Sequence, residues 1–244
     1  LYSSAASDVY KRQGQIIVSS KKPIVFENPS LTPDSGEGLD RGEFIDSIRD
    51  RDVAFGDETG LLSLAKGGGK TGGITIAGPS VTLKSAGLYS MTSKDDTGNI
   101  GVSGNISIRT GSAILENARV QLGSGLAPNP TGEISLQAQN GVSLAKQSFL
   151  VSESGLDISG GVAIVEGSLV ESKFSKVNVE GGMKLSANSA WNSETLDIAS
   201  PVLEVYESTV SYTHLRAHET REDGGRRLRG VKKIGGGGGG GGGG

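Results

Sequence analysis

Short apolar–polar–apolar triplets recur along this chain at a nearly constant spacing of about 21 residues. The triplets form three series. Those of the first series begin at Ile134, Leu156, Val177 and Leu196, and those of the second at Val142, Val162, Met183 and Leu203; a third, weaker series is marked by Phe149, Leu169 and Trp191. Alternation with a period of two predicts strands with one buried face. A fixed period in this range predicts a solenoid, in which each repeat buries its apolar face against its neighbours.

The recurrence predicts an all-β fold, a right-handed parallel β-helix with three short strands per coil. The handedness follows the general rule for parallel crossover connections. The low aromatic content of 5% and the 40 glycines also fit a turn-rich β architecture. A β-sandwich is the competing all-β fold, and it requires hairpin signals. Asn140-Gly141 is such a signal, but the triplets around it follow the 21-residue spacing.

Both ends of the chain can be encoded by the same DNA word in opposite orientations. Residues 8–13 (DVYKRQ) can be encoded by GATGTGTATAAGAGACAG, and the reverse complement read in a shifted frame encodes residues 210–214 (VSYTH). We interpret residues 1–13 and 209–244, including the Gly run 235–244, as translated sequencing-adaptor sequence and expect them to be disordered. A natural basic tail with a flexible Gly linker is the alternative. The remaining chain is then an internal fragment of a longer protein.

The remaining chain divides into two regions. Residues 72–208 are predicted to be the β-helix repeats, with loops inserted at 92–105 and 123–132. Residues 14–71 are predicted to be an irregular β region with an insertion loop, and part of the same β-helix. Its candidate elements are strands at 16–18, 24–26, 53–55 and 61–64, a loop at 28–41 and a short helix at 43–51.

Charge and composition exclude several classes of function. Without the two suspect ends, nine of 24 Lys and Arg and four of 27 Asp and Glu are lost, which leaves a net charge of −8. This argues against nucleic acid, which requires a basic surface. No apolar run is long enough for a transmembrane helix, so no membrane insertion is expected. Residues 14–208 contain neither His nor Cys, so His-dependent triads, thiol catalysis and His- or Cys-based metal sites are unavailable there.

The middle residues of the triplets in the first series should point outward from the β-helix, into solvent. They are Ser135, Asp157, Asn178 and Asp197. Coils stack about 4.8 Å apart, so Asp157 and Asp197 should lie about 10 Å apart across Asn178, which is too wide for one shared Ca²⁺. We therefore expect a solvated polar face, with a calcium or carboxylate-pair site as the alternative.

Four further features have a structural and a functional interpretation. Lys184 and Glu204 should occupy equivalent outward positions, where an exposed ion pair contributes only about 0–1 kcal/mol. Residues 67–71 (GGGKT) resemble a phosphate-binding loop but precede a strand, so a Gly-rich corner is predicted.

Trp191 is interpreted as packing in the core, with a sugar-stacking platform as the alternative. An acidic cluster lacks calcium-loop spacing and is interpreted as a solvated surface with weak cation binding as the alternative; it comprises Asp46, Asp50, Asp52, Asp57 and Glu58. No catalytic, cofactor-binding or metal-binding residue and no cofactor is predicted.

The triplets resemble the G-N-I-x-I repeats of filamentous haemagglutinin-like proteins. The matching segments lie within residues 72–205 and are 72–76 (GGITI), 99–100 (NI), 104–108 (GNISI) and 132–136 (GEISL), with Gly73 and Glu133 replacing the usual Asn. The resemblance implies a large extracellular or cell-surface bacterial fibre that is exported by two-partner secretion through an outer-membrane transporter and acts in adhesion. Host or environmental glycans or cell surfaces are the implied binding partners.

The expected function is therefore that of a structural rod with an adhesive role and no enzymatic activity. A carbohydrate-active β-helix enzyme, of the polysaccharide lyase or hydrolase type, is the alternative. A convergent acidic–basic cluster on one outer face would favour the enzyme, since such reactions require positioned carboxylates and a cation. A bare surface lined by Ser, Thr and Asn would favour the adhesin.

Overall fold

The computed structural model of the chain describes residues 15–28, 59–66, 69–93, 98, 101–123 and 132–218. All regular structure in this part of the chain is β, and it comprises β1 (Ile16–Ser19), β2 (Ile24–Glu27), β3 (Thr59–Lys66), β4 (Ile74–Lys84), β5 (Ala86–Ser93), β6 (Ile106–Glu116), β7 (Arg119–Leu122), β8 (Glu133–Ala145), β9 (Phe149–Glu166), β10 (Leu169–Ser186), β11 (Ala190–Ala199), β12 (Leu203–Val205) and β13 (Thr209–His218). Within these ranges no helix is present that could cross a membrane.

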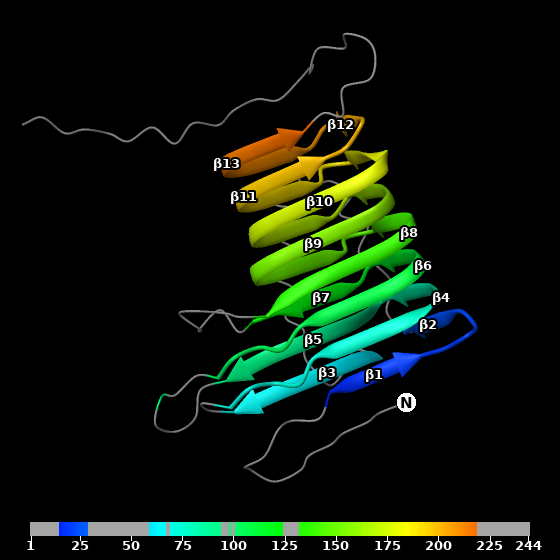
Figure 1. Cartoon of the computed structure of the whole chain (residues 1–244), viewed down its shortest axis with the longest axis vertical. Coiled ribbons are helices and arrows are strands. Elements are labelled where there is room, and N and C mark those ends of the chain that lie inside the picture. Colours follow the sequence, from blue (N-terminus) through cyan, green and yellow to red (C-terminus); the bar gives the residue numbers. More distant parts are fainter. Residues whose placement is uncertain are drawn as a thin grey trace, which may run out of the picture.

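The strands join in one thirteen-stranded sheet, and every pairing between them is parallel. The longest path runs β1-β4-β6-β8-β9-β10-β11-β13, and Figure 1 shows these strands stacked one above another along the long axis of the molecule. The predicted all-β, parallel architecture is confirmed, and it is compatible with a β-helix.

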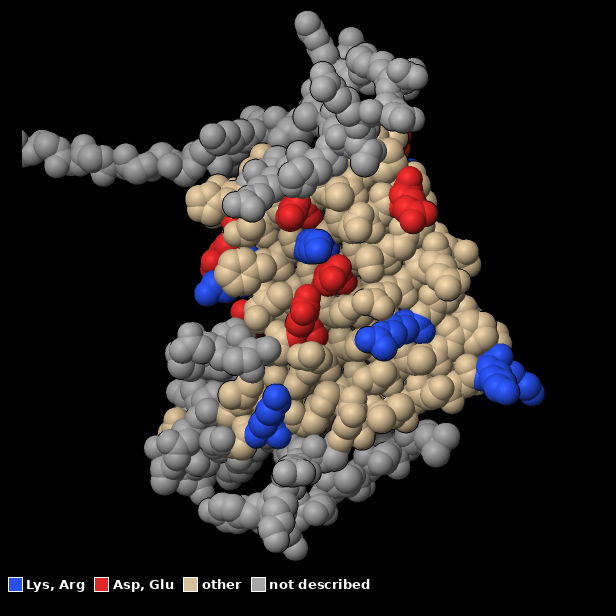
Figure 2. Space-filling model, in the orientation of Figure 1, with Lys and Arg blue, Asp and Glu red and all other residues tan. Residues whose placement is uncertain are grey.

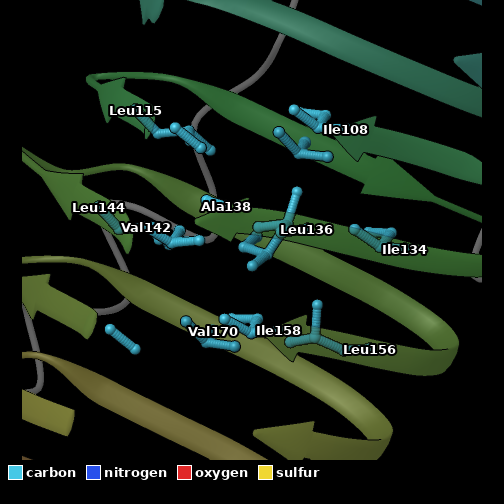
Figure 3. Close-up of a cluster of buried hydrophobic side chains, with 14 of the residues drawn as sticks. Ile108, Leu115, Ile134, Leu136, Ala138, Val142, Leu144, Leu156, Ile158 and Val170 are labelled. Carbon is cyan, nitrogen blue, oxygen red and sulfur yellow. The ribbon is translucent and has the colours of Figure 1, made fainter. Parts of the chain in front are cut away.

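Register partners fall into three ladders, which we call the first, second and third. The inward positions that define them are Ile74, Ile106, Ile134, Leu156, Ser175 and Leu196; Val81, Ala113, Val142, Ala163, Met183 and Leu203; and Leu88, Val120, Leu150, Val170, Trp191 and Val210. The apolar members meet in one continuous core, part of which is seen in Figure 3. Burying one such side chain stabilises the fold by about 1.5–3 kcal/mol, so the ladders fix the register.

Three predicted positions are shifted in the observed register. Ala163, not Val162, aligns with Val142, so Ala163 and Val165 point inward and Ile164 is 36% exposed. The apolar run from Val162 to Val165 supports either frame, and a register shift at the preceding corner selects the second one.

The other two shifts affect the first and third ladders. Ser175, not Val177, aligns with Leu156. The spacing between β9 and β10 is already 20 residues at Phe149 and Leu169, and it falls to 19 residues because the corner after Ser172 is one residue shorter than the corner after Ser152. Trp191 aligns with Val170, whereas Ala190 aligns with Leu169 and Phe149. The last three form a small second cluster of buried apolar residues.

The chain turns from the second ladder to the third through residues in the left-handed conformation. The residues with positive φ at these turns are Ser85, Asn117, Lys146, Gln147, Gly167, Ala187, Asn188 and Glu207. Buried serines follow directly and bond to one another from repeat to repeat. The backbone N–H of Ser148 donates to Ser168 Oγ at 3.2 Å, and that of Ser168 donates to Ser189 Oγ at 3.3 Å. We call Ser148, Ser168 and Ser189 the serine ladder.

The first region adds a further repeat to the stack. Its predicted strands at 16–18, 24–26 and 61–64 are confirmed as β1, β2 and β3, which pair with β4 and β5. The predicted strand at 53–55, the helix at 43–51, most of the loop at 28–41 and the acidic cluster lie outside the described residues.

Residues 209–218, which the sequence assigned to the disordered end, form β13 and pair in register with β11. Alternating apolar residues explain this: Val210 and Tyr212 are half-buried and pack on the core above Trp191. The adaptor origin of this segment stays a prediction about its DNA.

Candidate functional site

A row of charged residues runs across the outer face of the first ladder. Asp157 of β9 is in register with Lys176 of β10, and Lys176 is in register with Asp197 of β11. The sequence placed Asn178 between the two aspartates, and this is wrong: Asn178 aligns with Ser159 and Ala199 instead. The difference comes from the two-residue register error at Ser175.

Lys176 changes the chemistry of this row. A lysine stands at the register position between the two aspartates, so the row alternates in the sign of its charge. Figure 2 shows acidic and basic side chains close together over the upper strands of this face. The described ranges contain no cluster of three Asp, Glu, His or Cys side chains that could hold a metal ion. The row is best explained as a solvated surface with alternating charge.

A polar groove lies on the same face at the other end of the stack. It has a volume of about 430 Å³ and is lined by residues of β4, β6 and β8, with Gln15 just before β1 at one end. Its lining residues are Gln15, Gly73, Thr75, Asn105, Ile106, Ser107, Arg109, Glu133 and Ser135. We call this feature the polar groove.

The floor of the polar groove is made of outward side chains in successive repeats. Thr75, Ser107 and Ser135 are register partners, and each is the polar middle residue of a triplet whose apolar members are fully buried. Because Ile74, Ile106 and Ile134 anchor these strands in the core, the three hydroxyls are held in a fixed row about 4.8 Å apart.

The two charged residues of the polar groove lie at opposite ends. Glu133 aligns with Asn105, and its backbone N–H donates to Asn105 Oδ1 at 3.1 Å. Arg109 lies four residues further along the neighbouring strand, which places its Cα about 14 Å from that of Glu133. Both side chains are exposed. This separation allows the groove to bind one negatively charged and one positively charged group at different points.

A buried network of hydroxyl groups supports the corner beside the polar groove. Thr71 Oγ1 and Ser90 Oγ lie 3.0 Å apart, and Ser90 Oγ donates to the carbonyl oxygen of Gly104 at 2.8 Å. Thr71 Oγ1 also accepts a hydrogen bond from the backbone N–H of Gly104. Since these groups are buried, their mutual bonds avoid the cost of unsatisfied polar atoms and hold the corner rigid.

The same corner contains residues 69–71 of the predicted Gly-rich motif at 67–71, whose first two residues lie outside the described residues. The motif joins β3 to β4, so a strand follows it and a phosphate-binding helix N-terminus does not. Thr71, which a phosphate loop would direct towards a metal ion, is 2% exposed and bonds to Ser90. The predicted structural role is confirmed for the described part of the motif, residues 69–71.

The predicted inserted segments at 92–105 and 123–132 correspond to the connections from β5 to β6 and from β7 to β8, except that Thr92 and Ser93 belong to β5. Residues 94–97, 99–100 and 124–131 of these segments lie outside the described residues. Regular repeats cross the same corner in a few residues, as between Ser193 and Leu196. The longer connections therefore occur in the repeats that form the polar groove.

Trp191 and Lys184 are placed as the sequence predicted. Trp191 is fully buried in the core, so it is not available as a sugar platform. Lys184 and Glu204 are exposed register partners in β10 and β12.

A close ion pair joins Lys146 Nζ to Glu116 Oε2 at 2.9 Å on the exposed surface, where it contributes little stability.

Sequence reasoning did not identify Arg109 or the polar groove. Its hydroxyls were visible as the middle residues of three well-formed triplets, ITI, ISI and ISL, but a Ser or Thr at an outward position is ordinary in a strand. The only feature of the sequence that pointed to the groove was the middle residue of these triplets: it is Ser or Thr in three successive repeats and charged in later repeats.

Comparisons of the chain with protein-family models, with curated proteins and with solved structures found no match.

Proposed function

We propose that the chain is a segment of a right-handed parallel β-helix with three strands per coil, and that this helix is a structural rod with an adhesive role. The three ladders support three strands per coil, because each repeat contributes one segment to each ladder. The resemblance of its triplets to filamentous haemagglutinin-like repeats supports a bacterial fibre at the cell surface or outside the cell, exported with the help of an outer-membrane transporter.

The observation that carries the proposal is the continuous stacking of the inward positions from β1 to β13, which register shifts at the corners do not interrupt. Each repeat buries its apolar residues only against its neighbours, so further repeats lengthen the stack without a new core. A stack of this kind projects a surface away from its point of attachment and presents similar polar positions along its length. Weak binding at several of these positions adds up through avidity.

Adhesion of beads that carry the full chain at high density tests the proposal. We expect the beads to bind at least one surface in a panel of immobilised polysaccharides and cell-surface glycans. Free chain should compete only at concentrations about 10²–10⁴-fold higher, because it lacks multivalency. Beads coated with an unrelated acidic protein are the control. Absence of adhesion on every surface of the panel would contradict the adhesive role.

A carbohydrate-active enzyme is the second candidate, and the position of two carboxylates favours it. Glu133 aligns with Gly155, two residues before Asp157 on the neighbouring strand, so their Cα atoms lie about 8 Å apart on one outer face. Glycosidases place paired carboxyl groups about 5–9.5 Å apart. Release of reducing ends from the same polysaccharide panel, abolished by Glu133→Gln and by Asp157→Asn, would establish this function in place of the non-enzymatic rod.

A further inference from the structure

We propose that the polar groove binds an acidic oligosaccharide, with one sugar carboxylate on Arg109 and neutral sugar hydroxyls along Thr75, Ser107 and Ser135. This inference rests on the proposed adhesive function and specifies the class of ligand for it.

Arg109 is an exposed cation that the rest of the described chain does not neutralise. Its guanidinium makes no hydrogen bond or ion pair with the described residues. From strand geometry, the Cα of Arg109 lies about 14 Å from that of Glu133 and about 12 Å from that of Asp157, and no ion pair joins Arg109 to either carboxylate. A guanidinium presents a planar fork of donors that matches a carboxylate in a bidentate arrangement.

The floor of the polar groove suits the hydroxyl groups of a sugar. Ser107 and Ser135 make no hydrogen bond with the described part of the chain, so their hydroxyls are free to donate and accept. Thr75 Oγ1 accepts a bond from Gln15 Nε2 at 3.1 Å, which leaves its hydroxyl hydrogen available as a donor. Asn105 adds an amide at the edge of the groove.

The strands beneath the polar groove make a peptide an unsuitable ligand. β4 is paired with β1 and β6, and β6 is paired with β4 and β8, so the two central strands of the groove offer no free edge for a peptide to extend; among the described strands of the groove only β1, at its end, has one unpaired edge. Its outward groups are hydroxyls, amides and two charged side chains. A ligand must therefore be recognised through side chains and through its own hydroxyl groups.

Glu133 sets the orientation of the ligand. A carboxylate near Glu133 would be repelled, whereas one near Arg109 would be attracted. We therefore expect a ligand with a single acidic sugar at one end and neutral sugars beyond it. A polyanionic chain with a carboxylate on every ring would place like charges beside Glu133.

Nuclear magnetic resonance titration of the full chain tests this inference with three probes. They are an aldotriouronic acid with one glucuronic acid on two xylose units, its methyl ester, and neutral xylotriose. We expect shifts at Ser107 and Arg109, and an affinity for the acid about tenfold higher than for the ester, as for a hydrogen bond to a charged group. Arg109→Gln should abolish the difference, and Arg109→Lys should retain part of it.

Lys184→Gln is the matched control, because it removes an exposed cation from another face of the stack. It should leave the preference for the acid unchanged. Equal affinities for acid and ester, an unaltered preference in Arg109→Gln, or no binding of any probe would overturn the inference. Bead adhesion of the unaltered chain separates the two proposals. Adhesion by an unaltered chain that shows no preference for the acid over its ester refutes only the inference, whereas complete absence of adhesion refutes the proposed function.

Discussion

Trp191 Nε1 donates a hydrogen bond of 3.0 Å to Ser175 Oγ inside the core of the stack. The indole is fully buried and Ser175 is 3% exposed, so neither group reaches water. Ser175 occupies an inward position that isoleucine or leucine fills in other repeats. The smaller serine and the larger tryptophan of the adjoining repeat therefore compensate in volume, and the bond satisfies both polar groups.

We expect Trp191→Ala to lower the free energy of unfolding by about 3–5 kcal/mol, because it opens a large cavity. Ser175→Ala should cost about 1–3 kcal/mol, since the indole N–H then has no partner. Chemical denaturation of the full chain measures both. Thr82→Ser is the control, because Thr82 points outward in the same stack. A midpoint for Trp191→Ala equal to that of the control would contradict the assignment of Trp191 to the core.

Gly160 allows β8 and β9 to approach closely at a corner. Its φ is +138°, and a Cβ at this position would lie 1.7 Å from the carbonyl oxygen of Ala138. We expect Gly160→Ala to destabilise the chain by at least about 3 kcal/mol, because strained dihedral angles add to a backbone clash. Thermal unfolding followed by circular dichroism measures this loss.

Gly155→Ala is the matched control for this change. Its Cβ would come no closer than 3.2 Å, to the flexible side chain of Glu133. It should change stability by no more than about 0.5 kcal/mol. Equal losses in the two variants would show that the close approach at Gly160 is not the cause.

The sequence predicted the parallel all-β fold because alternation and spacing are both visible in the residues. It did not predict the register of every repeat, because some positions satisfy two frames. Val162, Ile164 and Val165 are all apolar, and only the length of the corner decides which of them point inward. Ser175 is polar at an inward position, and its hydrogen bonds with Trp191 Nε1 and Ser172 Oγ explain this.

The candidate site was less predictable for a related reason. A groove depends on which outward side chains lie side by side, and a one-residue or two-residue error in register changes those neighbours completely. Asn178 was placed beside Asp157 by such an error, although Lys176 is the true neighbour. Arg109 carries no motif, so its role follows only from the polar side chains that adjoin it in the fold.

Lys176 is expected to prevent calcium binding between Asp157 and Asp197. Lys176→Asp would place three carboxylates in neighbouring register positions about 4.8 Å apart. Without calcium this variant should lose about 0.2–1 kcal/mol for each like-charge contact. Millimolar CaCl₂ should raise the melting temperature of the variant and leave that of the unaltered chain unchanged, since oxygen ligands then surround one site.

Lys184→Asp provides the control for calcium binding. It places a carboxylate beside Glu204 only, because its other neighbour is Ile164. Two carboxylates should give little calcium-dependent stabilisation. An increase in the melting temperature of the unaltered chain with CaCl₂ would show that calcium binds despite Lys176.

β13 covers the edge of β11, and its removal tests how far residues 209–218 contribute to the fold. Truncation after Ser208 removes the register partners of Trp191 and Leu196 and exposes the backbone groups of β11. We expect lower stability and self-association, because unpaired parallel edges recruit other strands. Truncation after His218 retains β13 and is the control. Light scattering and thermal unfolding of both forms measure the difference, and identical behaviour would show that β13 adds nothing to the stack. The codons for residues 3–13 and 209–220 test the adaptor origin of these segments independently of the structure. A match to the inverted adaptor word would show that the DNA of β13 comes from an adaptor, and that β13 pairs in register because Val210 and Tyr212 alternate with polar residues.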